Sequence, residues 1–162
     1  MKLRNLSLTT LLAATIAATA CTLPAASAAE PCRCPHPIEK SPCPRPAEYW
    51  KGHLKHTEVT SLRLGQKAYS REELQALLKM HDHGDQSIVL AKEMIAAKLN
   101  RMMGADTSAI DQVCAHASSL LNRTGQLPYK AFLPRRAALA MYQDAAALEI
   151  FNKGKLTPKC KK

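Results

Sequence analysis

Aromatic residues are scarce in this 162-residue chain, which has one Trp, four Tyr and two Phe. A hydrophobic core must then be built mainly from Leu, Ile, Val, Met and Ala, a composition that favours helices over sheets. The sequence also lacks the G-x-S-x-G, H-E-x-x-H and phosphate-loop motifs, which argues against the enzyme classes that use them. We therefore expect an all-α protein that is not an enzyme and needs no cofactor.

Long hydrophobic runs are absent beyond the N-terminal segment. There, Lys2 and Arg4 precede an uncharged run of apolar and small residues at 6–20, and residues 26–28 form a small-x-small cleavage signal. This three-part pattern is typical of a secretory signal peptide. The run is shorter than the about 20 residues of a transmembrane helix. We predict a signal peptide at 1–28, no transmembrane helix, and a mature chain in the periplasm or outside the cell.

A second processing site is an alternative. Small residues precede Cys21, as in lipoproteins, although Ala18 stands where leucine is usual. Acyl chains on Cys21 would hold the protein at a membrane surface, whereas cleavage after Ala28 would release it. Membrane association is therefore expected only if Cys21 is lipidated.

Five cysteines remain after cleavage at Ala28, and an exported chain favours disulfides over free thiols. An odd number leaves at least one cysteine free or paired with another molecule. A bond from the N-terminal cluster to either of the two distant cysteines would fix both chain ends to the core, but spacing does not decide the pairing. The disulfide candidates are Cys32, Cys34, Cys43, Cys114 and Cys160.

The cysteine cluster lies in a proline-rich segment, 29–46, with six prolines between residues 31 and 46. Proline fixes φ and removes amide donors, so we expect an extended spacer. The alternative is a metal site, which would make the protein a periplasmic metal-binding protein. Its C-x-C-x-H-x6-C spacing differs from the paired cysteines of structural zinc sites. The ligands would be Cys32, Cys34, His36 and Cys43.

The domain proper, 47–154, shows the signals of a compact bundle of about four helices and one minor β-hairpin. Ser70 and Glu73 form a capping box, and Asp85 can cap a second helix that ends at Gly104. Gly65-Gln66 predicts a hairpin turn with glycine first. The expected buried residues are Leu74, Leu77 and Leu78; Ile88, Ala91, Ile95, Leu99 and Met102; and Ile110, Val113, Cys114, Ala117, Leu120 and Leu121.

The last predicted helix opens at Pro134 and ends near Gly154. Helical spacing favours a buried face made of Tyr142, Ala146 and Ile150, with Leu139 beside it. Residues 155–162 form a basic tail.

Basic residues outnumber acidic ones, 23 to 13, and removal of Lys2 and Arg4 lowers the formal net charge from +10 to +8. From Arg123 onward there are nine Lys or Arg against Asp144 and Glu149. An exported cationic protein has anionic polymers of the envelope as natural partners, or another exported protein. The alternative is a solvated basic face that confers solubility. The binding candidates are Tyr49, Trp50, His53, Arg135 and Arg136.

The only tryptophan lies in the segment AEYWKGHLKH, residues 47–56. Either this segment offers an aromatic surface to a ligand, or Trp50 anchors it against the helix around Ile95 and Leu99. With so few aromatic residues in the chain, one indole is a large share of the core. We therefore favour the anchor.

Several short motifs resemble a domain found in secreted bacterial proteins. They are the YWK-x-H opening at 49–53, the Leu64-Gly65 hairpin, the GD-x-S turn at 84–87 and the IAAKLN helix at 95–100. The resemblance extends over residues 47–122, with Glu48 and Gly52 as departures. It implies a helical fold and export, and it implies no catalytic mechanism. We predict an exported, disulfide-stabilised helical module with a structural or interaction role in the bacterial envelope or outside the cell.

Overall fold

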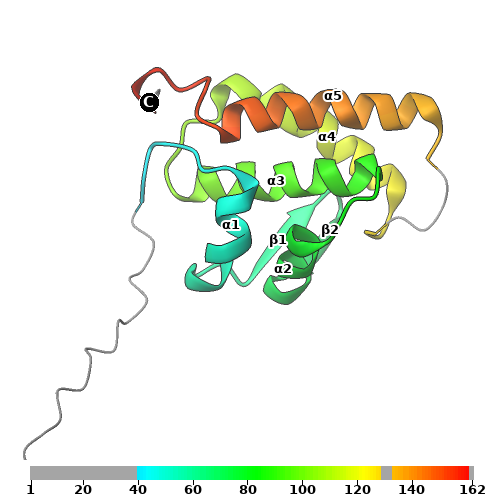
Figure 1. The fold of residues 1–162 in the computed structure, drawn as a ribbon, viewed down its shortest axis with the longest axis horizontal. Coiled ribbons are helices and arrows are strands. Elements are labelled where there is room, and N and C mark those ends of the chain that lie inside the picture. The colour runs from blue at the N-terminus through cyan, green and yellow to red at the C-terminus, as the bar shows by residue number, and fades with distance from the viewer. Residues whose placement is uncertain (1–39, 129–132, 161–162) are drawn as a thin grey trace, which may run out of the picture. The chain divides into compact units, whose positions relative to one another are not determined.

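The computed structural model describes residues 40–128 and 133–160. Within them the chain forms helices and one two-stranded antiparallel hairpin, which confirms the predicted class (Figure 1). The four expected helices are present, and a short helix at the tryptophan segment is added. The helices are α1 (Ala47–His53), α2 (Arg71–Lys79), α3 (Gln86–Met102), α4 (Asp111–Thr124) and α5 (Arg135–Asn152). The hairpin strands are β1 (Ser61–Leu64) and β2 (Lys67–Ser70), and the 3-10 turns are Leu54–His56, Ser108–Ile110 and Pro158–Cys160.

Helix α3 is the centre of the fold. Helices α4 and α5 lie on one side of it, and α1, α2 and the hairpin lie on the other (Figure 1). Ten of its residues are buried, so α3 has almost no face for solvent. Ala91, Ala96 and Ala97 are fully enclosed and allow neighbouring elements to approach closely.

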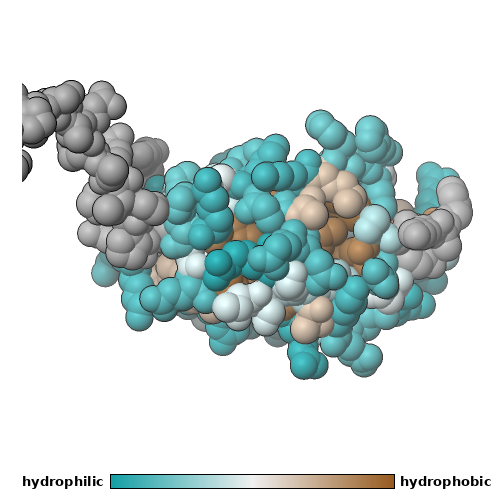
Figure 2. Space-filling model, turned by 90° about the horizontal axis from the view of Figure 1, so that it is seen from below, coloured by the Kyte–Doolittle hydropathy of each residue, from teal (hydrophilic) through white to brown (hydrophobic). Residues whose placement is uncertain are grey.

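The face seen from the side of α1, the hairpin and α2 is covered mainly by hydrophilic residues (Figure 2). Hydrophobic residues are visible there in the hollows between them. No helix in the described parts of the chain combines the length and apolar character needed to cross a membrane.

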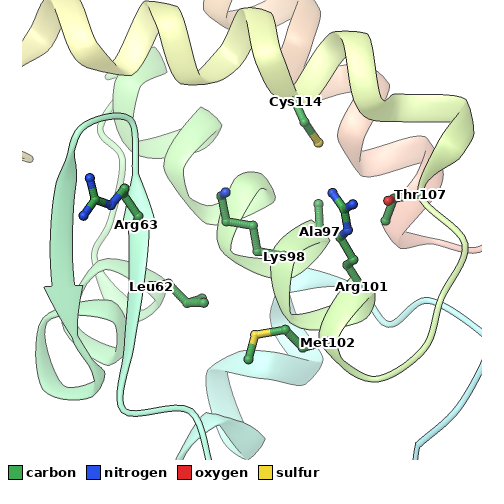
Figure 3. Close-up of a pocket in the computed structure, with 8 residues that line it drawn as sticks. All are labelled: Leu62, Arg63, Ala97, Lys98, Arg101, Met102, Thr107 and Cys114. Carbon is green, nitrogen blue, oxygen red and sulfur yellow. The ribbon is translucent and has the colours of Figure 1, made fainter.

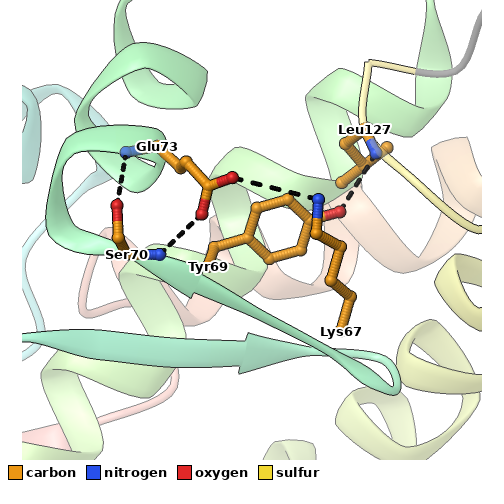
Figure 4. A network of polar contacts seen from close by, with 5 residues as sticks. All are labelled: Lys67, Tyr69, Ser70, Glu73 and Leu127. Atoms are coloured by element: carbon orange, nitrogen blue, oxygen red, sulfur yellow. Dashed lines mark hydrogen bonds and ion pairs between the residues drawn. The ribbon is translucent and has the colours of Figure 1, made fainter.

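Local signals in the sequence place the hairpin and the start of α2. The Ser70 side chain accepts a hydrogen bond from the Glu73 amide at 3.3 Å, and Glu73 Oε2 accepts one from the Ser70 amide at 2.8 Å (Figure 4). This is the predicted capping box. Gly65 has a φ of 62°, as a glycine-first turn requires. A Cβ there would collide with the Asn122 side chain, so glycine also permits close contact with α4.

Tyr69 joins the hairpin to the chain that follows α4. The ring is buried, and its hydroxyl accepts a hydrogen bond from the Leu127 amide at 3.0 Å (Figure 4). The Lys67 ammonium lies 4.6 Å from the centre of the same ring and 3.9 Å from Glu73 Oε1. The phenol therefore satisfies a buried amide that no helix or strand would satisfy.

The predicted buried faces of the first three long helices are largely confirmed. Leu74, Leu77 and Leu78 are buried, and Ser87 donates its amide to the capping Asp85 carboxylate at 2.9 Å. Met102 is an exception with 50% of its surface exposed, because it lies in the last turn of α3, beyond the neighbouring helices. Val113 and Cys114 are half-buried.

The predicted buried face of α5 is wrong. Leu139, Tyr142 and Ile150 are exposed at 56%, 58% and 42% of their surfaces. The buried residues are Met141, Ala145, Leu148, Phe151 and Asn152. Both rows have helical spacing and apolar character, so periodicity did not distinguish them. The row that contains Asn152 faces α3, where the amide finds its hydrogen-bond partners.

Candidate functional site

A disulfide between Cys43 and Cys160 brings the two ends of the described chain together. Their Cα atoms are 5.4 Å apart, and 117 residues separate them in sequence. Constraining a loop of that length in the unfolded chain is worth about 4 to 5 kcal/mol. The bond is one of the pairings that the sequence left open. Among the described residues Cys114 has no disulfide partner, while Cys32 and Cys34 lie outside them.

A groove of about 910 Å³ lies around this disulfide. Residues 41–46 form one wall, and residues 153–160 contribute the other. Its described lining contains four cationic side chains and no acidic one. The cations are Arg45, Lys153, Lys155 and Lys159.

The four cations differ in how far they are neutralised. Lys153 forms an ion pair and hydrogen bond with Glu149 one helical turn earlier, and this contact raises the pKa of Lys153. Within the described residues, no carboxylate lies within 4.0 Å of Arg45, Lys155 or Lys159. The groove therefore presents a local excess of positive charge, which attracts anions.

A buried asparagine on α3 fixes the first wall. Asn100 Oδ1 accepts hydrogen bonds from the Arg45 amide at 2.8 Å and from Trp50 Nε1 at 3.1 Å. Its Nδ2 donates to the Arg45 carbonyl at 2.9 Å and to Asn152 Oδ1 at 2.9 Å. These four bonds use the full capacity of the carboxamide.

The second wall is fixed through Asn152, which is fully buried in the last turn of α5. Its Nδ2 donates to the Glu93 carbonyl at 3.0 Å and to Glu93 Oε2 at 2.8 Å. Arg45 and Asn152, which directly precedes Lys153, are thus attached to the same surface of α3. The rigid buried network supports the exposed cations.

Trp50 acts as an anchor in this network. The indole is 1% exposed, so its predicted burial is confirmed. Helix α1 contacts α3, and the Asn100 carboxamide satisfies the indole N–H.

Tyr49 and His53 lie beside Arg45, which lines the groove. Their rings are stacked with centroids 4.0 Å apart and an angle of 4° between the planes. The Arg45 guanidinium carbon lies 5.3 Å from the centre of the Tyr49 ring. His53 is exposed and Tyr49 is half-buried, so the two predicted binding residues lie next to the groove through Arg45.

Arg135 and Arg136 do not join this site. Both are exposed in the first turn of α5, and the groove lysines follow its last turn. A helix of 18 residues is about 27 Å long, so the arginines lie at the opposite end (Figure 1). The sequence analysis missed Arg45 and both asparagines. Two asparagines beside core residues Leu99 and Phe151 were the signal available for them.

The proposed metal ligands are also corrected. Cys43 is bonded to Cys160 and cannot serve as a thiolate ligand. Cys32, Cys34 and His36 lie outside the described residues. Within residues 40–128 and 133–160, no group of three or more His, Cys, Asp or Glu side chains is placed to hold a metal.

Comparison with known proteins found no matching family model, no matching curated protein and no matching solved structure. The resemblance to a secreted bacterial domain therefore stays a prediction.

Replacing Asn100 with alanine should lower the free energy of unfolding by at least about 3 kcal/mol. The change leaves the Trp50 N–H, the Arg45 backbone groups and the Asn152 amide without their partner, and each buried unsatisfied group costs about 1 to 3 kcal/mol. Urea unfolding followed by the fluorescence of the single tryptophan measures the loss. The control is Gln112→Ala on the exposed side of α4, where a change within 0.5 kcal/mol is expected. Equal effects of the two changes would contradict the structural role of Asn100.

Glu93 should make stability depend on pH. Burial raises the pKa of the Glu93 carboxyl, and the Asn152 hydrogen bond opposes that rise only in part. Because the folded pKa lies above the unfolded value of about 4.3, the favourable contribution is complete below the unfolded pKa. It is lost as pH rises through the folded pKa.

Glu93→Gln keeps an oxygen for Asn152 and removes the charge. Its stability relative to the wild type should therefore increase between pH 4 and pH 7, as measured by urea unfolding at each pH. Exposed Glu58→Gln removes the same charge and should show a smaller change with pH. A variant whose relative stability falls over this range would refute the assignment.

Proposed function

We propose that the protein is an exported, disulfide-stabilised helical module that binds an anionic polymer of the bacterial envelope or its surroundings through the groove. The observation that carries this proposal is the convergence of Arg45, Lys153, Lys155 and Lys159 around the Cys43–Cys160 bond. The role is one of binding, without catalysis.

Export is supported by two independent features. The N-terminal 28 residues have the pattern of a signal peptide, and disulfides persist in oxidising compartments. The bond between Cys43 and Cys160 also stabilises the chain end that carries the lysines. The proposed place is the periplasm or the extracellular space, with lipid anchoring through Cys21 as the alternative.

The form of the groove favours a polymer over a compact ligand. The groove is wide, and its charges come from two chain segments that are well separated in sequence. A single exposed ion pair contributes about 1 kcal/mol or less, so useful affinity requires several contacts with one ligand. A chain with repeated negative charges supplies them. The stacked Tyr49 and His53 rings add a flat surface beside Arg45 for the polymer backbone.

Export can be tested by the mass of the mature protein from its native host. We expect a chain that begins at Ala29 and is two hydrogens lighter for the Cys43–Cys160 bond, with that bond confirmed in a non-reduced peptide map. An acylated chain beginning at Cys21 would support the lipid-anchored alternative. A full-length cytoplasmic chain with both thiols reduced would overturn export.

Polymer binding can be tested with fluorescent dextran sulfate, with uncharged dextran as the matched polymer. The double change Lys155→Gln and Lys159→Gln should weaken binding about tenfold at low salt, which corresponds to about 1.4 kcal/mol. It should also reduce the dependence of Kd on salt concentration, because fewer ion pairs form.

The matched control is Lys79→Gln with Arg123→Gln, which removes the same charge from exposed positions on α2 and α4. We expect this control to change the Kd for dextran sulfate by less than about twofold. Equal losses in both double variants would show that net charge alone drives binding and would refute the groove. Binding of uncharged dextran at similar affinity would refute an electrostatic mechanism.

A further inference from the structure

A second hollow, of about 240 Å³, lies between β1, α3 and α4 (Figure 3). Its lining shares no residue with the groove at the disulfide. This volume lies just below the range of about 300 to 1,000 Å³ found for pockets of drug-sized ligands. This is the size of a small organic molecule.

One side of this hollow is cationic. Arg63 comes from β1, while Lys98 and Arg101 come from α3 one turn apart (Figure 3). Arg101 is partly neutralised by Asp111, with 3.8 Å between Nη1 and Oδ1. Within the described parts of the chain, no carboxylate lies within 4.0 Å of Arg63 or Lys98. Lys98 and the partly paired Arg101 therefore face one small space, while Arg63 stands at its edge with the guanidinium directed away over the hairpin (Figure 3).

The rest of the lining is mainly apolar. Leu62 and Ala97 belong to the core, and Met102 stands at the edge with half of its surface exposed. The Met102 side chain was expected in the core, and its place beside this hollow gives an apolar surface that a ligand can cover. The Cys114 thiol faces the space from α4 (Figure 3).

We propose that this hollow binds a small amphipathic anion, a carboxylate with a short aliphatic body. The carboxylate lies between Lys98 and Arg101, and the aliphatic part covers Leu62, Ala97 and Met102. Both halves of the lining are then used, since a purely apolar molecule would leave the cations without a partner and an inorganic anion would leave the apolar wall exposed. This site is independent of polymer binding at the groove.

Cys114 provides a reporter for the test. Burial raises the pKa of its thiol, and the nearby cations Lys98 and Arg101 oppose the rise, so alkylation is followed at alkaline pH, where more of the thiol is in the reactive thiolate form. The mature protein with its disulfide intact is treated with iodoacetamide, and alkylation of the Cys114 peptide is followed by mass spectrometry. Peptide mapping separates this thiol from the other cysteines.

Hexanoate, with eight heavy atoms, should slow Cys114 alkylation at least about fivefold at saturation, with half of the effect in the millimolar range expected for so small a ligand. The uncharged 1-hexanol should give little protection. Lys98→Gln should raise the hexanoate concentration needed for half of the protection about tenfold, because it removes one charge contact with the carboxylate. Lys92→Gln, on another face of the same helix, should leave it unchanged.

The exposed variant Arg101→Gln provides a second test if Lys98→Gln does not fold. Equal protection by hexanol and hexanoate would overturn the proposal, because the hollow would then be only hydrophobic. The proposal would also be overturned if hexanoate gave no protection at about 50 mM. Full protection in both charge variants would overturn it as well. None of these outcomes bears on dextran sulfate binding at the groove.

Discussion

The carboxamide of Asn100 makes four hydrogen bonds inside the protein, and the rest of the structure is arranged around them. A buried amide that lacks partners would be strongly destabilising, so its position requires a complete set of donors and acceptors at the right places. The chain supplies them from three separate segments: the backbone of Arg45, the indole of Trp50 and the side chain of Asn152. Because no partner can move without leaving a polar group unsatisfied, this network specifies how the N-terminal segment and α5 lie on α3.

The same network explains how a small helical domain can hold a charged groove in a fixed shape. Cationic side chains repel one another, and long exposed side chains are mobile, so a cluster of them needs support from below. The Asn100 bonds hold the backbone of Arg45, and Asn152 holds the end of α5 from which Lys153 and Lys155 continue. The Cys43–Cys160 bond, which lies in the lining of the groove, joins the two segments covalently. Polar bonds in the core and one covalent bond at the surface thus act on the same two segments.

The groove and the hollow beside Cys114 show two uses of positive charge on one chain. In the groove the cations are spread over an open surface, which suits repeated weak contacts with a long anion. In the hollow, Lys98 and Arg101 face an apolar wall in a smaller space, which suits one charge attached to one short aliphatic group. The physical difference is the size of the space and the larger apolar share of the lining of the hollow, which adds the hydrophobic contribution of a ligand.

The sequence by itself determined the helical class, the hairpin and most helix ends, because these depend on neighbours within a few residues. The Ser70–Glu73 capping box and the Gly65 turn are examples, and their structures agree with the predictions. Only the tertiary structure decided which face of α5 is buried, which cysteine pairs with Cys43, and which groups surround Asn100. Each of those outcomes depends on residues 50 or more positions apart, and local pattern carries no information about which distant partner a side chain meets. On α5 both candidate faces have helical spacing and apolar residues, and the buried face is the one whose Asn152 amide meets its partners on α3.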